Sequence, residues 1–377
     1  AASDCKSCAA GLYSDQTGRD EASDCIACGT GKYNDQLAQS AESGCKSCPV
    51  GTYNDVAGQT AVSNCKECPK GTYLDELGQD AVADCKDCSV GKYNANLGSG
   101  DASHCNDCAV GRYNDVAAQT EPWDCKQCAK GKYADQVGQA SCKVCAAGTY
   151  QPETAQESDS SCIACPAGTF SASTGQEEST NCTPCDAGKY GNQAGQTASS
   201  ACINCGVGKF SASTSQDAES DCADCAVGKY GDQVAQTACK NCGEGKYNDA
   251  TGQDQESDCK ACGEGKYNDE TGQDAESDCK SCTAGRYGDQ TGLTAVSSCK
   301  ACAAGTYSAL TGQDEASDCT SCAAGKYNEL TGNGSASDCK DCPAGKYQNL
   351  QGSANCKDCT AGRWSDQGGQ SALSDCT

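Results

Sequence analysis

The stretch CKSCAAGLY at residues 5–13 decides the fold, because its pattern Cys-x-x-Cys-x-x-Gly-x-aromatic recurs along the whole chain. There are nineteen copies, and each keeps both cysteines, the glycine and an aromatic ring. The first cysteines follow one another at steps of 20 residues, apart from three steps of 17. A fixed period of this length predicts a repeat array, in which each unit buries its surface against its neighbours and not in one shared core.

We predict one continuous cysteine-rich repeat array over residues 1–377. Its opening residues AASDC match the end of an internal repeat, and no second cysteine follows Cys376. We therefore expect the chain to be a window of a longer array. The repeats start at Cys5, Cys25, Cys45, Cys65, Cys85, Cys105, Cys125, Cys142, Cys162, Cys182, Cys202, Cys222, Cys239, Cys259, Cys279, Cys299, Cys319, Cys339 and Cys356.

The composition argues against an ordinary globular core. The 377 residues include 39 Cys and 44 Gly, but no Met, two Phe and two Trp. Cysteine at more than a tenth of the chain indicates that cross-links replace a core. Because so many disulfides persist only in oxidising compartments, we expect the protein to be extracellular or at the cell surface.

The charge excludes several classes of partner. The formal net charge is -24, from 52 acidic and 28 basic residues. This balance opposes binding to nucleic acid and to anionic membranes. No stretch approaches the roughly 20 apolar residues that a membrane span needs. With one His and no core in which to desolvate a carboxylate, we expect no enzymatic activity and no catalytic or cofactor-binding residue.

Each repeat is expected to be a small disulfide-rich unit of short β-hairpins and loops. No apolar periodicity of 3.6 residues occurs, which argues against long helices. Short strands are predicted around Gly-x-Tyr and around Cys-Lys-x-Cys, joined by Gly and Asn/Asp turns. The three short repeats all lose residues just before the next cysteine, as in QASC at 139–142, which indicates a surface loop. The array should be an elongated, solenoid-like rod without a globular core.

The spacing leaves the disulfide pairing open. In a ladder, the second cysteine of each pair bonds the first cysteine of the next pair, and each closed loop contributes roughly 3 kcal/mol in the chain-entropy model. Bonds within each Cys-x-x-Cys are typical of redox sites and would leave the long loops unclosed. Other pairings between neighbouring repeats remain alternatives. The ladder would use every cysteine except Cys5 and run through Cys8–Cys25, Cys28–Cys45 and Cys48–Cys65 to Cys359–Cys376.

The glycine and the ring of the motif are interpreted as structural. The glycine fits a backbone with positive φ, or a close passage of the chain beside a disulfide. The ring is Tyr in sixteen copies. It fits packing on the disulfide and the next repeat, with the hydroxyl at the wet edge of a thin core. These roles are assigned to Gly11, Tyr13, Gly168, Phe170, Gly362 and Trp364.

Two metals compete with this interpretation. Two consecutive Cys-x-x-Cys pairs lie within the spacing range of a zinc ribbon. Zinc sites would alternate along the chain and impose a period of 40, which the sequence shows only locally. Acidic loops such as NDETGQDAESD at 268–278 offer oxygen ligands for calcium, although the EF-hand pattern is absent. A solvated acidic face is the preferred interpretation of these loops.

Two glycosylation sequons occur. Asn333 begins Asn-Gly-Ser and Asn181 begins Asn-Cys-Thr. Cysteine at the middle position is a poor context, so Asn333 is the stronger candidate for a glycan.

The motif also resembles a known family. In CPAGTF at 165–170 and CPAGKY at 342–347 it resembles the ephrin-receptor-like cysteine-rich repeat, and it is similar to the cysteine-rich modules of tumour-necrosis-factor and growth-factor receptors. The resemblance implies the ladder pairing, for example Cys165 with Cys182, and an extracellular, elongated, non-enzymatic protein. Long arrays of such repeats occur in large surface and appendage proteins of algae, ciliates and other protists.

Two functional hypotheses follow. The first is a structural protein of an extracellular filament, stalk or flagellar-hair-like appendage, whose partners are like chains and glycans. The alternative is a ligand-binding or adhesive cell-surface ectodomain, which would need a repeat that diverges from the others. The divergent stretches are EPWDC at 121–125 and WSDQGGQ at 364–370.

Overall fold

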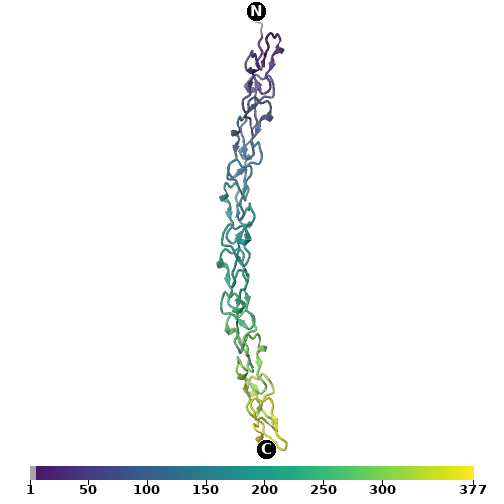
Figure 1. Cartoon of the computed structure of the whole chain (residues 1–377), viewed down its shortest axis with the longest axis vertical. Helices are drawn as coiled ribbons and strands as arrows, with labels where there is room; N and C mark the ends of the chain where they lie inside the picture. Colours follow the sequence, from purple (N-terminus) through teal and green to yellow (C-terminus); the bar gives the residue numbers. More distant parts are fainter. Residues whose placement is uncertain (1–5) are drawn as a thin grey trace. The chain divides into compact units, whose positions relative to one another are not determined.

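The repeats form short antiparallel hairpins in a computed structural model that describes residues 6–377 (Figure 1). In each hairpin, the strand that carries the ring pairs with the strand between the cysteines of the next motif. For example, β7 (Thr72–Tyr73) pairs with β8 (Lys86–Asp87), with Tyr73 opposite Lys86. The predicted fold class of small disulfide-rich hairpin repeats is confirmed, and no α-helix occurs among the described residues.

All the strands are two residues long. The others are β1 (Leu12–Tyr13), β2 (Ile26–Ala27), β3 (Lys32–Tyr33), β4 (Lys46–Ser47), β5 (Thr52–Tyr53), β6 (Lys66–Glu67), β9 (Lys92–Tyr93), β10 (Asn106–Asp107), β11 (Arg112–Tyr113), β12 (Lys126–Gln127), β13 (Lys132–Tyr133), β14 (Lys143–Val144), β15 (Thr149–Tyr150), β16 (Ile163–Ala164), β17 (Thr169–Phe170), β18 (Thr183–Pro184), β19 (Lys189–Tyr190), β20 (Ile203–Asn204), β21 (Lys209–Phe210), β22 (Ala223–Asp224), β23 (Lys229–Tyr230), β24 (Lys240–Asn241), β25 (Lys246–Tyr247), β26 (Lys260–Ala261), β27 (Lys266–Tyr267), β28 (Lys280–Ser281), β29 (Arg286–Tyr287), β30 (Lys300–Ala301), β31 (Thr306–Tyr307), β32 (Thr320–Ser321), β33 (Lys326–Tyr327), β34 (Lys340–Asp341), β35 (Lys346–Tyr347) and β36 (Lys357–Asp358).

A single 3-10 turn precedes the first cysteine of most repeats. These turns are η1 (Ala22–Asp24), η2 (Glu42–Gly44), η3 (Val62–Asn64), η4 (Val82–Asp84), η5 (Ala102–His104), η6 (Pro122–Asp124), η7 (Asp159–Ser161), η8 (Ser179–Asn181), η9 (Ser199–Ala201), η10 (Glu219–Asp221), η11 (Glu256–Asp258), η12 (Glu276–Asp278), η13 (Val296–Ser298), η14 (Ala316–Asp318), η15 (Ala336–Asp338) and η16 (Leu373–Asp375).

The last residue of the 3-10 turn fixes the turn to the preceding backbone. In η4, Asp84 Oδ2 accepts hydrogen bonds from the backbone N–H groups of Asp80 at 3.3 Å and Ala81 at 3.0 Å. Such side-chain bonds satisfy donors that so short a helix leaves unpaired. The three short repeats, which end at Cys142, Cys239 and Cys356, have no such turn. The missing residues are therefore one complete 3-10 turn, so the deletion leaves the hairpin intact.

The chain divides into two compact units. Unit 1 contains the chain up to Thr183 together with Ala194–Ser199, and unit 2 contains Pro184–Gln193 and Ser200–Thr377. Within both units the buried apolar residues are mainly half-cystines, and second cysteines such as Cys28 and Cys242 are fully buried. No helix of the described residues has the length and apolar character that crossing a bilayer requires.

Candidate functional site: the joint between repeats

The recurring site is the joint, which we define as one Cys-x-x-Cys-x-x-Gly-x-aromatic motif and the backbone that contacts it. The structure pairs the second cysteine of each motif with the first cysteine of the next, and every cysteine of residues 6–377 belongs to such a bond. The two cysteines of one motif thus belong to two different loops. Cys5 lies outside the described residues.

These pairs include the ones named from the sequence. They are Cys8–Cys25, Cys28–Cys45, Cys48–Cys65, Cys165–Cys182 and Cys359–Cys376, with Cα atoms 5.7 to 5.9 Å apart. Zinc needs deprotonated thiols, and each of these sulfurs is already bonded to another sulfur. The described cysteines therefore offer no zinc ligands.

The joint at Cys88 shows how one repeat is tied to the next. The Cys88 carbonyl accepts a hydrogen bond from the N–H of Ala118 at 2.9 Å, and Gly91 donates to the Asn114 carbonyl at 2.7 Å. Tyr93 forms a parallel bridge to Gln119. These backbone bonds join segments 23 to 30 residues apart, so the disulfide loop and the following repeat are held together by main chain as well as by sulfur.

The glycine of the joint also contacts the second repeat along the chain. Gly91 has a φ of 84°, which disfavours any residue with a Cβ. A Cβ at this position would lie 2.6 Å from the carbonyl carbon of Gly138. This joint is therefore completed by backbone two repeats later, and the ion pair of Lys70 with Glu121 at 2.8 Å spans a similar distance along the chain.

The other glycines assigned from the sequence share this conformation. Gly11, Gly168 and Gly362 have φ of 85°, 81° and 87°. At Gly11 the approaching backbone is that of Gly58, whereas a Cβ on Gly362 would have nothing within 4 Å. At Gly11 the close neighbour is thus a carbonyl two repeats away and not a disulfide.

The ring of the joint is buried to different extents along the chain. Tyr190 is 8% exposed and clusters with Cys205 and Cys222, which form the disulfide of the next repeat. Tyr230 packs in the same way on Cys242 and Cys259. Tyr13 and Phe170 are half-buried. Trp364, in the last repeat, is 63% exposed.

A buried asparagine after the ring is a part of the joint that the sequence interpretation missed. It stands in seven repeats, each time at most 3% exposed, although the stretch reads as a polar surface turn. The residues are Asn34, Asn54, Asn94, Asn114, Asn248, Asn268 and Asn328. In Asn54, Nδ2 donates to the Lys32 carbonyl at 2.9 Å and Oδ1 accepts from the Val56 N–H at 3.1 Å.

This side-chain amide therefore forms two hydrogen bonds, one that closes its own turn and one to the backbone of the preceding repeat. The same pair of contacts recurs at Asn94, Asn114, Asn248 and Asn268. The signal in the sequence was the recurrence of Asn directly after Tyr, which a solvated turn does not require. At the equivalent position of another repeat, Leu74 is 1% exposed and fills the space without polar bonds.

Ion pairs cover the outside of the hairpins. Lys46 Nζ lies 2.8 Å from Asp35, and this hydrogen bond lowers the pKa of Asp35 and raises the pKa of Lys46. Equivalent pairs include Lys66 with Asp55 and Lys260 with Asp249. Both partners remain largely exposed, so the pairs are surface interactions with a small effect on stability.

The acidic residues proposed as calcium ligands have other partners. In the 268–278 loop, Asp269 and Glu270 pair with Lys280 at 2.6 and 3.0 Å, and Asp278 accepts from the Asp274 and Ala275 N–H groups. No group of three or more His, Cys, Asp or Glu residues that could hold a metal ion occurs within residues 6–377. The carboxylates thus serve as turn caps and ion-pair partners and do not converge on one point.

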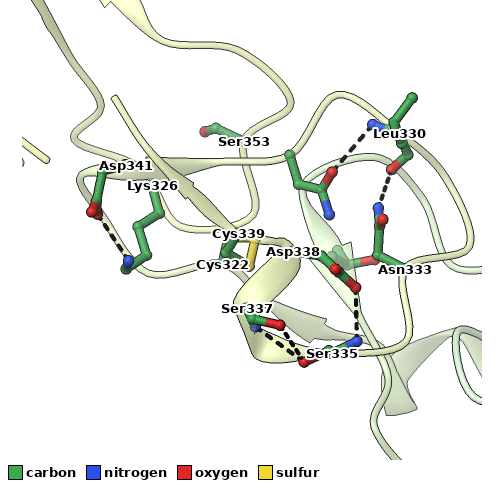
Figure 2. The surroundings of a disulfide bond; sticks show 12 residues. Cys322, Lys326, Leu330, Asn333, Ser335, Ser337, Asp338, Cys339, Asp341 and Ser353 are labelled. Carbon is green, nitrogen blue, oxygen red and sulfur yellow. Dashed lines mark hydrogen bonds and ion pairs between the residues drawn. A yellow bond between two sulfur atoms is a disulfide. The ribbon is translucent and has the colours of Figure 1, made fainter. Parts of the chain in front are cut away.

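The two sequon asparagines occupy different places in the repeat. Asn181 ends η8, and its Oδ1 accepts from the Glu178 N–H at 3.0 Å. Asn333 lies on the loop after β33, and its Nδ2 donates to the Leu330 carbonyl at 2.6 Å (Figure 2).

The joint, the hairpin and the ladder define the class of this protein as a tandem array of small disulfide-rich extracellular-type modules. The family described as tyrosine-protein kinase ephrin type A/B receptor-like matches residues 36–85, 131–180, 213–259 and 331–376, just over half of the chain. The chain belongs to this ephrin-receptor-like cysteine-rich repeat family. Membership indicates an extracellular receptor-like or structural module. No curated protein sequence matches the chain.

Proposed function

We propose that the chain is a structural protein of an extracellular filament, stalk or flagellar-hair-like appendage, in which the repeats act as one continuous array. The observation that carries this proposal is the sameness of the joints. The bond from the joint glycine N–H to a carbonyl of the next repeat recurs from Gly11 to Gly148 and from Gly188 to Gly345, with lengths of 2.6 to 2.9 Å. A uniform surface suits a polymer, whereas a receptor needs at least one repeat built differently.

The proposed location outside the cell rests on the disulfides. A ladder in which every loop is closed by sulfur is stable in an oxidising compartment and would be reduced in the cytosol. The net charge of -24 keeps such chains soluble before they assemble.

The proposed partners are like chains, and the turn tips offer a surface for them. In ten repeats, one of the two residues before the left-handed turn residue is an aliphatic side chain that is 49 to 68% exposed. We call these the turn-tip aliphatics: Leu37, Val56, Leu77, Leu97, Val116, Val137, Val234, Leu310, Leu330 and Leu350. Burying one such side chain between chains would contribute up to about 1.5–3 kcal/mol.

Electron microscopy of native material tests the filament, and self-association of the full chain tests the surface. Leu77→Glu combined with Leu97→Glu is expected to lower self-association measured by sedimentation. The matched control is Thr251→Glu with Thr291→Glu, which places the same charges at equivalent turns that lack an aliphatic. Equal sedimentation of both double variants would refute the role of the tips, and native material that is dispersed and tethered to membranes would refute the filament.

One observation favours the alternative, a ligand-binding or adhesive ectodomain. Trp123 in η6 is 74% exposed beside a hollow of about 430 Å³ that Tyr93 and Arg112 also line. Equivalent positions elsewhere hold small residues such as Ser63 and Ser103. If this repeat binds a ligand, Trp123→Ser should abolish adhesion of the chain to cells or immobilised glycans while Trp364→Tyr leaves it intact. Unchanged adhesion in Trp123→Ser would remove this candidate.

A further inference from the structure

We propose that Asn333 carries an N-linked glycan and that it is the only N-glycosylated residue of the described chain. The proposal requires passage through the secretory compartment, but it does not depend on whether the chain forms a filament. It rests on where each asparagine amide lies in the repeat.

Asn333 stands at a position where the main chain is fixed and the side chain is not required. Its backbone carbonyl accepts from the Ser308 N–H at 3.0 Å, and its backbone bridges Tyr307 in parallel. Gln occupies the equivalent position in fourteen of the nineteen copies, and Leu293 occupies it in one. The joint therefore needs the backbone at this position but tolerates several side chains.

Asn333 is half-buried, beside an exposed turn. Its Nδ2 donates to the Leu330 carbonyl, and Leu330 itself is 60% exposed (Figure 2). This contact uses one of the two amide hydrogens. The second can be replaced by a sugar while the first continues to donate.

The other two residues of the sequon differ in accessibility. Gly334 is half-buried, and a Cβ there would lie 3.2 Å from Ala284 Cβ, whereas Ser335 is exposed at the N-cap of η15. The Ser335 hydroxyl lies 2.7 Å from the Ser337 hydroxyl, which is on the same exposed turn. None of these three residues is a half-cystine, and the disulfide that closes their loop joins Cys322 and Cys339.

The second sequon differs in its contacts and in its middle residue, although Asn181 itself is exposed. Asn181 is held as the cap of η8 through Glu178, and its middle residue Cys182 is 6% exposed and bonded to Cys165. Once that bond forms, the middle residue of this sequon is buried and covalently held, which is not so for Gly334. The seven asparagines of the joints are at most 3% exposed and none begins a sequon.

The modification is a group transfer from a lipid-pyrophosphate-linked oligosaccharide. A bond forms between Asn333 Nδ2 and the anomeric carbon of the first sugar, and the bond from that carbon to the phosphate oxygen breaks. The lipid pyrophosphate leaves with the electron pair, and the amide loses one proton. The product is a secondary amide that keeps the N–H needed for the Leu330 contact.

The test is peptide mass spectrometry of the full chain secreted from eukaryotic cells. After reduction and trypsin, the peptide of residues 327–340 is expected to carry hexose and N-acetylhexosamine mass. Peptide N-glycosidase in heavy-oxygen water should convert Asn333 to labelled Asp, which distinguishes the glycan site from spontaneous deamidation at Asn-Gly. The peptide that contains Asn181 is expected at its unmodified mass.

Four variants make the result decisive. Asn333→Gln introduces the residue that most repeats hold here, so the fold is retained and the glycan mass should disappear. Ser335→Ala should abolish the glycan and Ser335→Thr should retain it, whereas Asn181→Gln should leave the total glycan mass unchanged. An unmodified 327–340 peptide in both the natural and the Ser335→Thr chain, or a glycan on Asn181, would overturn the proposal.

Discussion

The joint glycine permits a direct test of the contact between repeats that are two apart. Replacing Gly91 by Ala adds a Cβ at a φ of 84° and 2.6 Å from the carbonyl carbon of Gly138. The left-handed backbone alone costs roughly 1–2 kcal/mol for a residue with a Cβ. The clash involves main chain, so the repeats must separate and lose the N–H bonds of Gly91 and Gly138, at about 1 kcal/mol each. The expected total is about 3–4 kcal/mol.

Gly58→Ala is the matched control. Its φ is 76°, but the nearest atom to the added Cβ is Ala27 Cβ at 3.6 Å, which is an ordinary contact. Alanine already stands at the equivalent position in Ala38 and Ala118, with φ of 58°. Only the backbone cost of about 1–2 kcal/mol should therefore remain.

Hydrogen exchange of the full chain measures the difference. A gap of about 2 kcal/mol corresponds to roughly 30-fold faster exchange in Gly91→Ala than in Gly58→Ala. The increase should appear at the amides of both Gly91 and Gly138, because the clash opens both sides of the contact. Equal protection in the two variants, or a loss confined to the repeat that contains residue 91, would refute the two-repeat contact.

Three further outcomes are expected. Asn54→Ala leaves the Lys32 carbonyl and the Val56 N–H without their partner and should lower the local free energy of opening, measured by hydrogen exchange, by about 1–3 kcal/mol. Asn54→Leu should lower it less, because Leu74 fits the equivalent position of another repeat. A smaller loss in the Ala variant than in the Leu variant would contradict the role of the amide. Replacing both Cys88 and Cys105 by Ser should lower stability by about 3 kcal/mol and make proteolysis fastest within residues 89–104, and uniform cleavage along the chain would argue against the pairing. The lowered pKa of Asp35 makes the contribution of its pair with Lys46 fully present above the ordinary value of 3.8 and lost as the pH falls through the lowered pKa. The raised pKa of Lys46 keeps this contribution present below 10.5 and lost as the pH rises through the raised pKa. The small difference in urea midpoint between the natural chain and Lys46→Gln should thus be constant from about pH 5 to 9 and shrink in acid, and a difference that grows in acid would contradict the pair.

The period, the hairpin positions and the fold class could be predicted from the sequence, because the Cys-x-x-Cys pair, the glycine and the ring recur in every copy of the motif. The Asn54 amide could not be placed, because a polar residue in a Gly- and Asp-rich stretch reads as a solvated turn until its partner, the Lys32 carbonyl, is known. That partner lies 22 residues back, and nothing in the local pattern identifies it.

The backbone that contacts the joint glycine could not be predicted from the sequence either. Positive φ at Gly91 could be anticipated, but the approach of Gly138 depends on how the repeats are stacked. A fixed period sets only the spacing along the chain. The stacking follows from the summed backbone bonds, which involve residues of no distinctive type.

The ladder of disulfides gives the polypeptide a second covalent route around most of its length. A peptide bond cut between Cys28 and Cys45 leaves the two sides joined through sulfur. The short links between the two cysteines of one motif, such as Cys45 to Cys48, have no disulfide that spans them. In that link, β4 is hydrogen-bonded to β3, and Lys46 forms an ion pair with Asp35. Within residues 8–376, a single cut therefore severs the chain only in these links, where a hairpin must first open, and damage to the exposed loops accumulates without separating the two sides.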